Sequence, residues 1–201
     1  MNVLLALLAA YLLGSFPTSY VAGKLAGIDL RQHGSKNLGA TNVFRVLGWK
    51  YAVPVLLIDA AKGTAAAVLL GPWAGSQPWM PLMIGTAAAV GHVYTVFLSF
   101  KGGKGVATAA GVMVGIAPLA IGIVLGLWAV IVLLSGYVSL GSLLASAAFT
   151  PLALFLYPGN WYTASAGLAL TGLIWYTHRV NIGRLMAGTE ARFRRKGKTP
   201  A

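Results

Sequence analysis

The stretch from Val106 to Thr177 contains no charged residue, and this feature constrains the fold more than any other. A segment so long and so apolar is suited to the hydrocarbon core of a membrane. There each backbone N–H and C=O group must be satisfied within the protein, which favours helices. The rest of the chain agrees, because 58% of its 201 residues are hydrophobic and 9% are charged, against about 25% charged in soluble domains. The sequence therefore predicts an all-α polytopic membrane protein.

Turn and breaker residues divide the apolar sequence into seven transmembrane helices. Pro118 splits Val106–Leu134, and Ser135–Ser139 and Tyr157–Trp161 are expected turns. Some of these helices are shorter than the ~20 residues of a full crossing, so five spans are the alternative. With seven, all loop lysines and arginines fall on one side, which the positive-inside rule makes the cytoplasm. The N-terminus is then outside and the C-terminus cytoplasmic.

The first two spans are expected at Met1–Ala22 and Tyr51–Leu70. No positive residue precedes the first apolar run, and the first basic residue, Lys24, comes after it. This order favours an uncleaved anchor over a signal peptide. We interpret residues 1–201 as a single membrane domain, with polar segments at 23–50, 99–105 and 178–201 on its basic side.

Two pairs of glycines flank Pro118 at GxxxG spacing. Gly111 and Gly115 precede the proline, and Gly122 and Gly126 follow it. Small residues at this spacing let membrane helices approach closely. The sequence therefore predicts a tight hairpin of two helices, in which these glycines serve packing rather than chemistry.

The charge balance is strongly basic, with 15 Lys and Arg against 3 Asp and Glu and a net charge of +12. A basic balance can indicate nucleic-acid binding. In a membrane protein it follows instead from loop bias and from anionic headgroups and substrates, so we expect the lipid bilayer and no nucleic acid as partner. The chain has no cysteine, and its few histidines and acids form no metal-ligand pattern. Neither a metal nor a cofactor is expected.

A glycine-rich loop at Lys101–Gly105 interrupts the apolar sequence. Glycines allow backbone N–H groups to approach a ligand closely, and Lys104 comes just before an apolar helix-forming run. A helix N-terminus, free N–H groups and a lysine together favour phosphate binding. A basic turn between two membrane helices is the alternative. The expected phosphate-binding residues here are Gly102, Gly103, Lys104, Gly105 and Thr108.

A second polar segment, Gly34–Arg45, reads GSKNLGATNVFR. Its small and amide side chains can donate hydrogen bonds to phosphate or hydroxyl oxygens, and Arg45 can bind a phosphate with two N–H groups. Ordinary capped turns also use such residues. The candidates are Ser35, Asn37, Thr41, Asn42 and Arg45.

The third polar segment is His178–Glu190, HRVNIGRLMAGTE. His178 and Asn181 are three residues apart, so they share a face if the last span continues as a helix. Arg184 and Glu190 are supporting candidates, although an arginine here can also serve as an inside anchor. Beyond Glu190, the run Arg192–Lys198 is expected to be a solvated tail in contact with lipid.

Three ionisable residues fall inside apolar runs. Asp59 and Lys62 are three apart, so they can pair on one helix face. Charges within a membrane are costly and are usually functional or paired. We interpret the pair as supporting the site from below rather than contacting substrate. His92 is more typical of a hydrogen-bonded structural histidine than of a catalytic one.

The three polar segments resemble the bacterial acyl-phosphate:glycerol-3-phosphate acyltransferase family (PlsY). The matching patterns are GSKN-GATN--R at 34–45, GH-Y--F--FKGGKGVAT at 91–108 and H--NI-RL--G-E at 178–190. The resemblance implies transfer of a fatty acyl group from acyl phosphate to the 1-hydroxyl of sn-glycerol 3-phosphate, giving lysophosphatidic acid and phosphate. It also implies a multi-pass protein of the cell inner membrane with a cytoplasmic active site, and allows coupling to the enzyme that makes acyl phosphate.

The same resemblance suggests roles for individual residues. Lys104 with the glycine amides would hold one phosphate, and Arg45 with Ser35 and Asn37 the other, in an order left open. His178 and Asn181 would orient the glycerol hydroxyl or help with the transfer of its proton. A phosphate oxygen of the substrate is favoured over His178 as the proton acceptor.

We expect direct transfer without an acyl-enzyme, because acyl phosphate is already activated; attack by Ser35 with His178 as its base is the competing path. A transporter of an anionic phosphorylated metabolite is the alternative function, and a non-catalytic membrane subunit a further one. The sequence shows neither the inverted repeat nor the matched broken helices typical of transporters.

Overall fold

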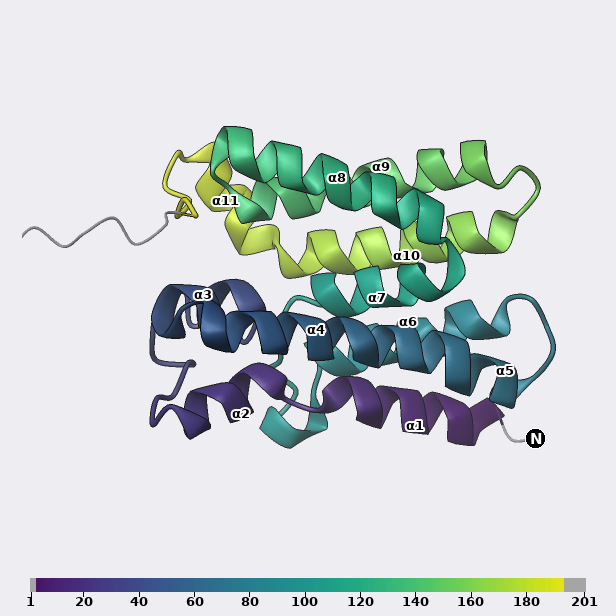
Figure 1. Ribbon diagram of the computed structural model, residues 1–201, viewed down its shortest axis with the longest axis horizontal. Helices are drawn as coiled ribbons and strands as arrows, with labels where there is room; N and C mark the ends of the chain where they lie inside the picture. Colours follow the sequence, from purple (N-terminus) through teal and green to yellow (C-terminus); the bar gives the residue numbers. More distant parts are fainter. Residues whose placement is uncertain (1–2, 194–201) are drawn as a thin grey trace, which may run out of the picture.

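The computed structural model describes residues 3–193, which form helices and no strand. Figure 1 shows the helices lying lengthwise beside one another, with connections at the two ends of the bundle. In chain order they are α1 (Val3–Ser15), α2 (Thr18–Leu25), α3 (Ala40–Leu47), α4 (Trp49–Ala65), the π-helix η1 (Ala66–Leu70), α5 (Gly71–Ala74), α6 (Met80–Val93), the 3-10 helix η2 (Val96–Leu98), α7 (Val106–Ile116), α8 (Pro118–Ser135), α9 (Val138–Leu156), α10 (Trp161–Thr177) and α11 (Arg179–Met186).

Helix α7 lies between two groups of helices. In Figure 1, α1, α4 and α6 lie on one side of it, and α8, α9 and α10 lie on the other. α1 packs against α6, α4 against α7, and α9 against both α8 and α10. The N-terminus is at one end of the bundle, and α2, α3 and α11 gather at the opposite end. The polar segments that hold α3 and α11 therefore share one end, called the basic end below.

Within residues 3–193, five helical stretches are long and apolar enough to cross a membrane. The expectation of an all-helical protein with several spans is therefore confirmed. α7 has 11 residues and α10 has 17, which is short for a full crossing. The count of seven and the orientation of the termini stay predictions. The five stretches are Val3–Leu25, Trp49–Ala74, Met80–Leu98, Pro118–Ser135 and Val138–Leu156.

Prolines set two of the helix breaks. The first span, expected as one helix, is broken between α1 and α2 by Phe16 and Pro17. Pro118 separates α7 from α8 as expected, because a proline has no N–H group to continue the preceding helix. The second span is longer than expected, since α4 continues through η1 into α5 and the stretch ends only at Ala74.

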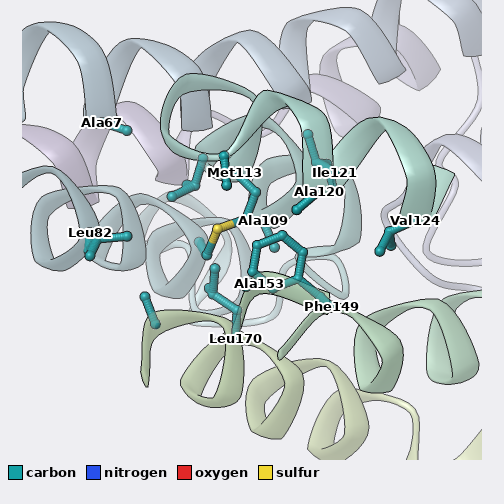
Figure 2. Close-up of a cluster of buried hydrophobic side chains, with 14 of the residues drawn as sticks. Ala67, Leu82, Ala109, Met113, Ala120, Ile121, Val124, Phe149, Ala153 and Leu170 are labelled. Atoms are coloured by element: carbon teal, nitrogen blue, oxygen red, sulfur yellow. The ribbon is translucent and has the colours of Figure 1, made fainter. Parts of the chain in front are cut away.

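The largest cluster of buried apolar side chains surrounds α7. Figure 2 shows Ala109 and Met113 of α7 meeting Phe149 of α9 and Leu170 of α10. Many members of this cluster are alanines, which bring helices close together. In a membrane, such van der Waals contacts between helices are a main source of stability, because the lipid is as apolar as the core.

The glycines of the GxxxG pairs pack differently from the expected hairpin. A methyl group at Gly111 would overlap the backbone of Ala60 in α4, and one at Gly115 would overlap Val68. No described residue lies within 4 Å of a methyl group placed at Gly122 or Gly126. The predicted α7–α8 packing through both pairs is therefore wrong. The first pair lets α7 approach α4, which is the closer neighbour of this central helix.

We predict that Gly111→Val lowers the thermal stability of the purified protein in detergent, whereas Gly122→Val does not. The valine side chain at 111 would force α7 away from α4, and overpacking of this kind costs about 1–3 kcal/mol. Thermal unfolding of both variants beside the wild type checks this. Equal midpoints for the two variants would contradict the packing described.

Candidate active site

A cavity of about 660 Å³ opens at the basic end and extends between the helices. Its polar part is formed by the segment before and within α3, by the loop before α7, and by the end of α10 with α11. Most of the residues that the sequence singled out line it, although they come from distant segments of the chain. They are Ser35, Asn37, Thr41, Asn42, Arg45, Asp59, His92, Lys104, Gly105, His178, Asn181, Arg184 and Glu190.

Four of the expected residues lie elsewhere. Gly102 and Gly103 line a separate small cavity beside His92. Lys62 is buried among backbone carbonyls and pairs with Asp59. Thr108 is buried in α7, and its hydroxyl has no hydrogen-bond partner among residues 3–193.

Lys104 is held from two directions. Its ammonium donates a hydrogen bond to Oδ1 of Asn181, and its carbonyl oxygen accepts one from the Thr177 hydroxyl at 3.1 Å. The Asn181 amide in turn donates to Glu190 Oε1 at 2.6 Å, and the Ser139 hydroxyl donates to the same oxygen at 2.7 Å. A continuous polar chain therefore connects the loop before α7 with α11 and the start of α9.

The backbone of the glycine loop corrects one expectation. The Gly102 N–H donates to the Val93 carbonyl at 2.9 Å, and the Gly103 N–H to the His92 carbonyl at 3.1 Å. These two donors are therefore occupied within the protein. The N–H groups of the first turn of α7 have no partner within the helix, and no side chain among residues 3–193 caps this end. They are the donors that this end of the cavity offers to an anion.

Gly105 makes the start of α7 possible. Its φ of 79° lies in the left-handed region, which side chains other than glycine rarely adopt. The turn at this residue brings α7 directly after Lys104. The ammonium and the positive end of the helix therefore lie on neighbouring residues, as the sequence predicted.

His178 lies at the junction of α10 and α11, where one helix ends and the next begins. The predicted continuous helix through His178 and Asn181 is therefore interrupted, yet both side chains line the cavity. The ring Nδ1 is 2.8 Å from the Ile174 carbonyl oxygen. A carbonyl can only accept, so Nδ1 carries the hydrogen. Burial, together with the nearby Lys104 ammonium, lowers the pKa of His178 to about 4, and Nε2 is left as an acceptor.

The side chain of Asn42 organises the segment that precedes α3. Its amide donates to the carbonyls of Leu30 and His33 at 3.3 and 3.1 Å, and its Oδ1 accepts from the Ser35 N–H at 2.8 Å. A methyl group at Gly34 would overlap this side chain. Asn42 therefore shapes the loop that presents Ser35, rather than offering free groups to a ligand.

The segment 187–193 crosses the basic end of the cavity. The Arg45 guanidinium donates to the Ala191 carbonyl at 3.1 Å, and the Phe193 ring stacks on Phe44 with centroids 4.7 Å apart. On the other side, Arg192 Nε donates to the Tyr137 hydroxyl at 3.2 Å. Arg192 and Phe193 are exposed, as expected of a solvated tail, but they also make these contacts with the bundle, which the sequence did not predict. Residues 194–198 of that run lie outside the described residues.

The polar part of the cavity is suited to anions. Lys104, Arg45 and Arg184 all line it. Burial lowers the pKa of Lys104 to about 8, with Arg184 and Arg45 adding to the effect and Glu190 opposing it. Burial is also the main cause that lowers the pKa of Arg45. Cations that are crowded together and partly removed from water bind a multivalent anion favourably, because its negative charge offsets their mutual repulsion.

The cavity also has an apolar part that sequence reasoning missed. It runs between α4, α7, α8, α9 and α10, away from the charged groups. Leu56, Leu57, Val114 and Leu125 on its rim are exposed at the surface of the bundle. Apolar residues in a membrane helix carry no signal that separates a groove from a packed core. The lining includes Met113, Ile121, Val124, Trp128, Ala145, Phe149 and Leu170.

Comparisons with known proteins agree with this geometry. A sequence model described as "Glycerol-3-phosphate acyltransferase" matches residues 4–188. The chain belongs to the glycerol-3-phosphate acyltransferase family. A glycerol-3-phosphate acyltransferase of Chlorobaculum tepidum is 44% identical, over 92% of this chain and 94% of its own length. Another, from Trichlorobacter lovleyi, is 46% identical over the same shares of the two chains.

Two solved structures of one member of this acyltransferase family are similar over nearly the whole chain. Both are crystal structures of PlsY, an integral membrane glycerol 3-phosphate acyltransferase. The glycerol 3-phosphate form matches with a TM-score of 0.89 and 42% identity, covering 96% of each chain. The lysophosphatidic acid form matches with a TM-score of 0.87 and 40% identity, covering 94% of each chain. The fold and the multi-pass membrane character are therefore those of the family.

We predict that the affinity for inorganic phosphate falls as pH rises through about 8. The lowered pKa of Lys104 means that its ammonium loses its proton near this pH rather than near 10. Above the pKa, affinity should fall by about tenfold per pH unit if binding needs the charged form. Titration calorimetry from pH 7 to 9.5 measures this. In Lys104→Arg the fall should move above this range, and an unchanged profile would contradict the assignment.

Proposed function

We propose that this protein transfers a fatty acyl group from acyl phosphate to the 1-hydroxyl of sn-glycerol 3-phosphate, producing lysophosphatidic acid and phosphate. The observation that carries the proposal is the two-part cavity, in which a cationic end continues into an apolar groove. Acyl phosphate and lysophosphatidic acid have the same two parts, a phosphate and a hydrocarbon chain. Family membership and the two ligand forms of PlsY support the acceptor and the product.

Two phosphates have to be held close together against their mutual repulsion. Lys104 and the first-turn amides of α7 would bind one, and Arg45 with Ser35 and Asn37 would bind the other. Both groups of residues line the same cavity. Holding the two reactants in one place converts a bimolecular reaction into an effectively unimolecular one, which can contribute about 7–11 kcal/mol. Binding and orientation are thus the main task of the protein.

His178 would direct the acceptor hydroxyl rather than keep its proton. Its Nε2 can accept a hydrogen bond from the hydroxyl, because Nδ1 is committed to the Ile174 carbonyl. With a pKa of about 4 it is a weak base. A phosphate monoester has a second pKa near 6, so an oxygen of the substrate phosphate is the stronger base. We therefore assign the proton to phosphate.

The transfer itself would be direct. The hydroxyl oxygen forms a bond to the acyl carbonyl carbon, the bond from that carbon to the phosphate oxygen breaks, and phosphate leaves with its electron pair. The N–H groups at the start of α7 are suited to stabilise the carbonyl oxygen as it becomes negative. A path through Ser35 is less well supported, because the Nδ1 of His178 faces a backbone carbonyl and no carboxylate orients it.

The proposal is tested with purified protein in detergent, supplied with acyl phosphate and glycerol 3-phosphate. Phosphate and lysophosphatidic acid should form in equal amounts. Lys104→Ala should lose roughly tenfold to a hundredfold in kcat/KM, because a charge-assisted contact to phosphate is worth about 1.5–3 kcal/mol. The matched control is Lys101→Ala in the same loop, where the side chain is exposed. A transporter would release no phosphate from these substrates. If the wild type releases none, the proposal is refuted.

The absence of an acyl-enzyme is a separate prediction. Wild-type protein incubated with radiolabelled acyl phosphate alone and then denatured should retain no label. Acyl phosphate needs no covalent activation, because phosphate is already a good leaving group. Label that stays on the wild type but is lost in Ser35→Ala, together with ping-pong kinetics, would instead establish Ser35 as the nucleophile.

We further propose that the basic end faces the cytoplasm of a cell inner membrane, where glycerol 3-phosphate is available. The excess of Lys and Arg at this end supports it. The chain has no cysteine, so single cysteines can report orientation. Ser76→Cys and Asn160→Cys should react with an impermeant thiol reagent added to intact cells. Protection of both would contradict this orientation.

A further inference from the structure

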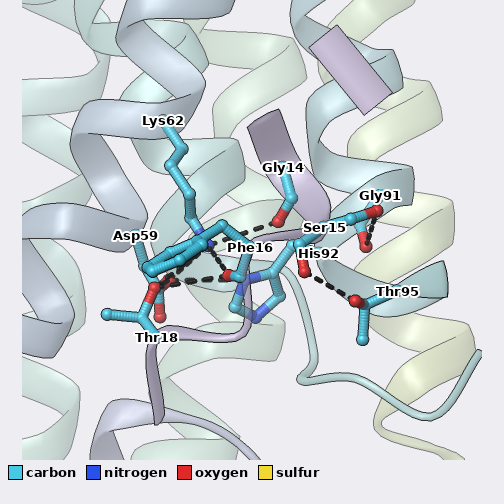
Figure 3. Close-up of polar contacts among 9 residues, drawn as sticks. All are labelled: Gly14, Ser15, Phe16, Thr18, Asp59, Lys62, Gly91, His92 and Thr95. Atoms are coloured by element: carbon cyan, nitrogen blue, oxygen red, sulfur yellow. Dashed lines mark hydrogen bonds and ion pairs between the residues drawn. The ribbon is translucent and has the colours of Figure 1, made fainter. Parts of the chain in front are cut away.

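A buried ionic cluster lies beside the active site, between α1, α4 and α6. Figure 3 shows Asp59 of α4 at its centre, with an exposed fraction of 1%. The Asp59 carboxylate accepts from Lys62 Nζ at 2.7 Å and from the Thr18 hydroxyl at 2.9 Å, and His92 Nδ1 lies 3.6 Å from the same oxygen. Ionisable groups inside a membrane protein are costly to bury and usually serve a function.

Lys62 accounts for only part of this cluster. Besides pairing with Asp59, its ammonium donates to the carbonyls of Gly14 and Phe16 at 3.2 and 2.8 Å. It therefore caps the end of α1 at the Phe16–Pro17 break, which is a structural task. The contact between Asp59 and His92 connects α4 with α6, the helix that precedes the glycine loop (Figure 3).

His92 contacts the glycine loop through both its backbone and its ring. Its carbonyl accepts the Gly103 N–H, and the next carbonyl, of Val93, accepts the Gly102 N–H. A methyl group at Gly103 would overlap Nε2 of the His92 ring on one side and the Leu38 carbonyl on the other. Gly103 thus lies in a slot between α6 and the segment before α3, and the His92 ring forms one wall of that slot.

Lys104 follows this slot directly in the chain. Its backbone is fixed at one end by Gly103 and at the other by the Thr177 hydroxyl. Because the His92 ring packs against Gly103, its position bears on the next residue, Lys104, and on the contact of Lys104 with Asn181. We propose that Asp59 and His92 form a positioning pair, which acts through Gly103 to place the Lys104 ammonium for phosphate binding.

This inference rests on the proposed function and is tested by a double-mutant cycle of His92→Ala and Lys104→Ala. The readouts are kcat/KM for lysophosphatidic acid formation and the affinity for inorganic phosphate. His92→Ala alone should lose about tenfold or more, since a displacement near 1 Å can cost a hundredfold. In the Lys104→Ala background the same change should lose less than about twofold, because the group that the pair positions is gone. Asp59→Asn should cause losses similar to those of His92→Ala, both in the wild type and in the Lys104→Ala background.

Stability is measured separately, because a merely structural pair would also affect it. The matched control is Thr64→Val on the same helix, which removes a hydrogen bond of 2.7 Å to the Gly111 carbonyl. It should lower the thermal midpoint and leave kcat/KM within about twofold of the wild type. Asp59→Asn leaves Lys62 unpaired and can therefore fail to fold. In that event the His92→Ala results alone test the positioning role.

Equal losses from His92→Ala in both backgrounds, or no loss in either, would overturn the positioning role. A wild type that forms no lysophosphatidic acid would count against the proposed function instead. In that case the positioning role is still tested by the phosphate affinities of the wild type, the two single variants and the double variant.

Discussion

The close contact between α4 and α7 determines where the charged groups of this protein lie. Methyl groups at Gly63 or Gly111 would each overlap the backbone of the opposing helix, so the two helices touch almost without side chains between them. α4 follows directly from α3, which carries Arg45, and α7 starts directly after Lys104. Backbone packing therefore fixes the relative positions of the two backbone segments from which these cations extend.

Much of the fold and the membership of the site could be predicted from the sequence. The helical membrane class follows from long apolar runs, which allow few other structures in lipid. The site could be assembled because the loop bias brings the polar segments to one side, and polar residues so concentrated in an apolar chain stand out. Lys104, Arg45, His178 and Asn181 were identified in this way, and all four line one cavity.

The details that were wrong or missed depend on contacts between distant segments. Gly102 and Gly103 looked like donors to phosphate, but their N–H groups bond to the end of α6, and nothing local in the sequence indicates that partner. The contacts of Arg192 and Phe193 were missed because their partners, Tyr137 and Phe44, are far away in the chain. The apolar groove could not be seen, because its lining has the composition of any membrane helix.

The short length of α7 has a consequence for the proposed transfer of an activated acyl group. With 11 residues it rises only about 16 Å, roughly half of a ~30 Å hydrocarbon layer. In Figure 1 its first turn is set back from the end of the bundle where α3 and α11 lie, and segment 187–193 crosses that end. Water attacks an acyl phosphate by the same route as a hydroxyl group does. For the acyl phosphate donor proposed above, a recessed helix start would place the reacting carbonyl group away from the open end of the bundle, so the depth of this short helix would bear on how much of the donor is lost to hydrolysis.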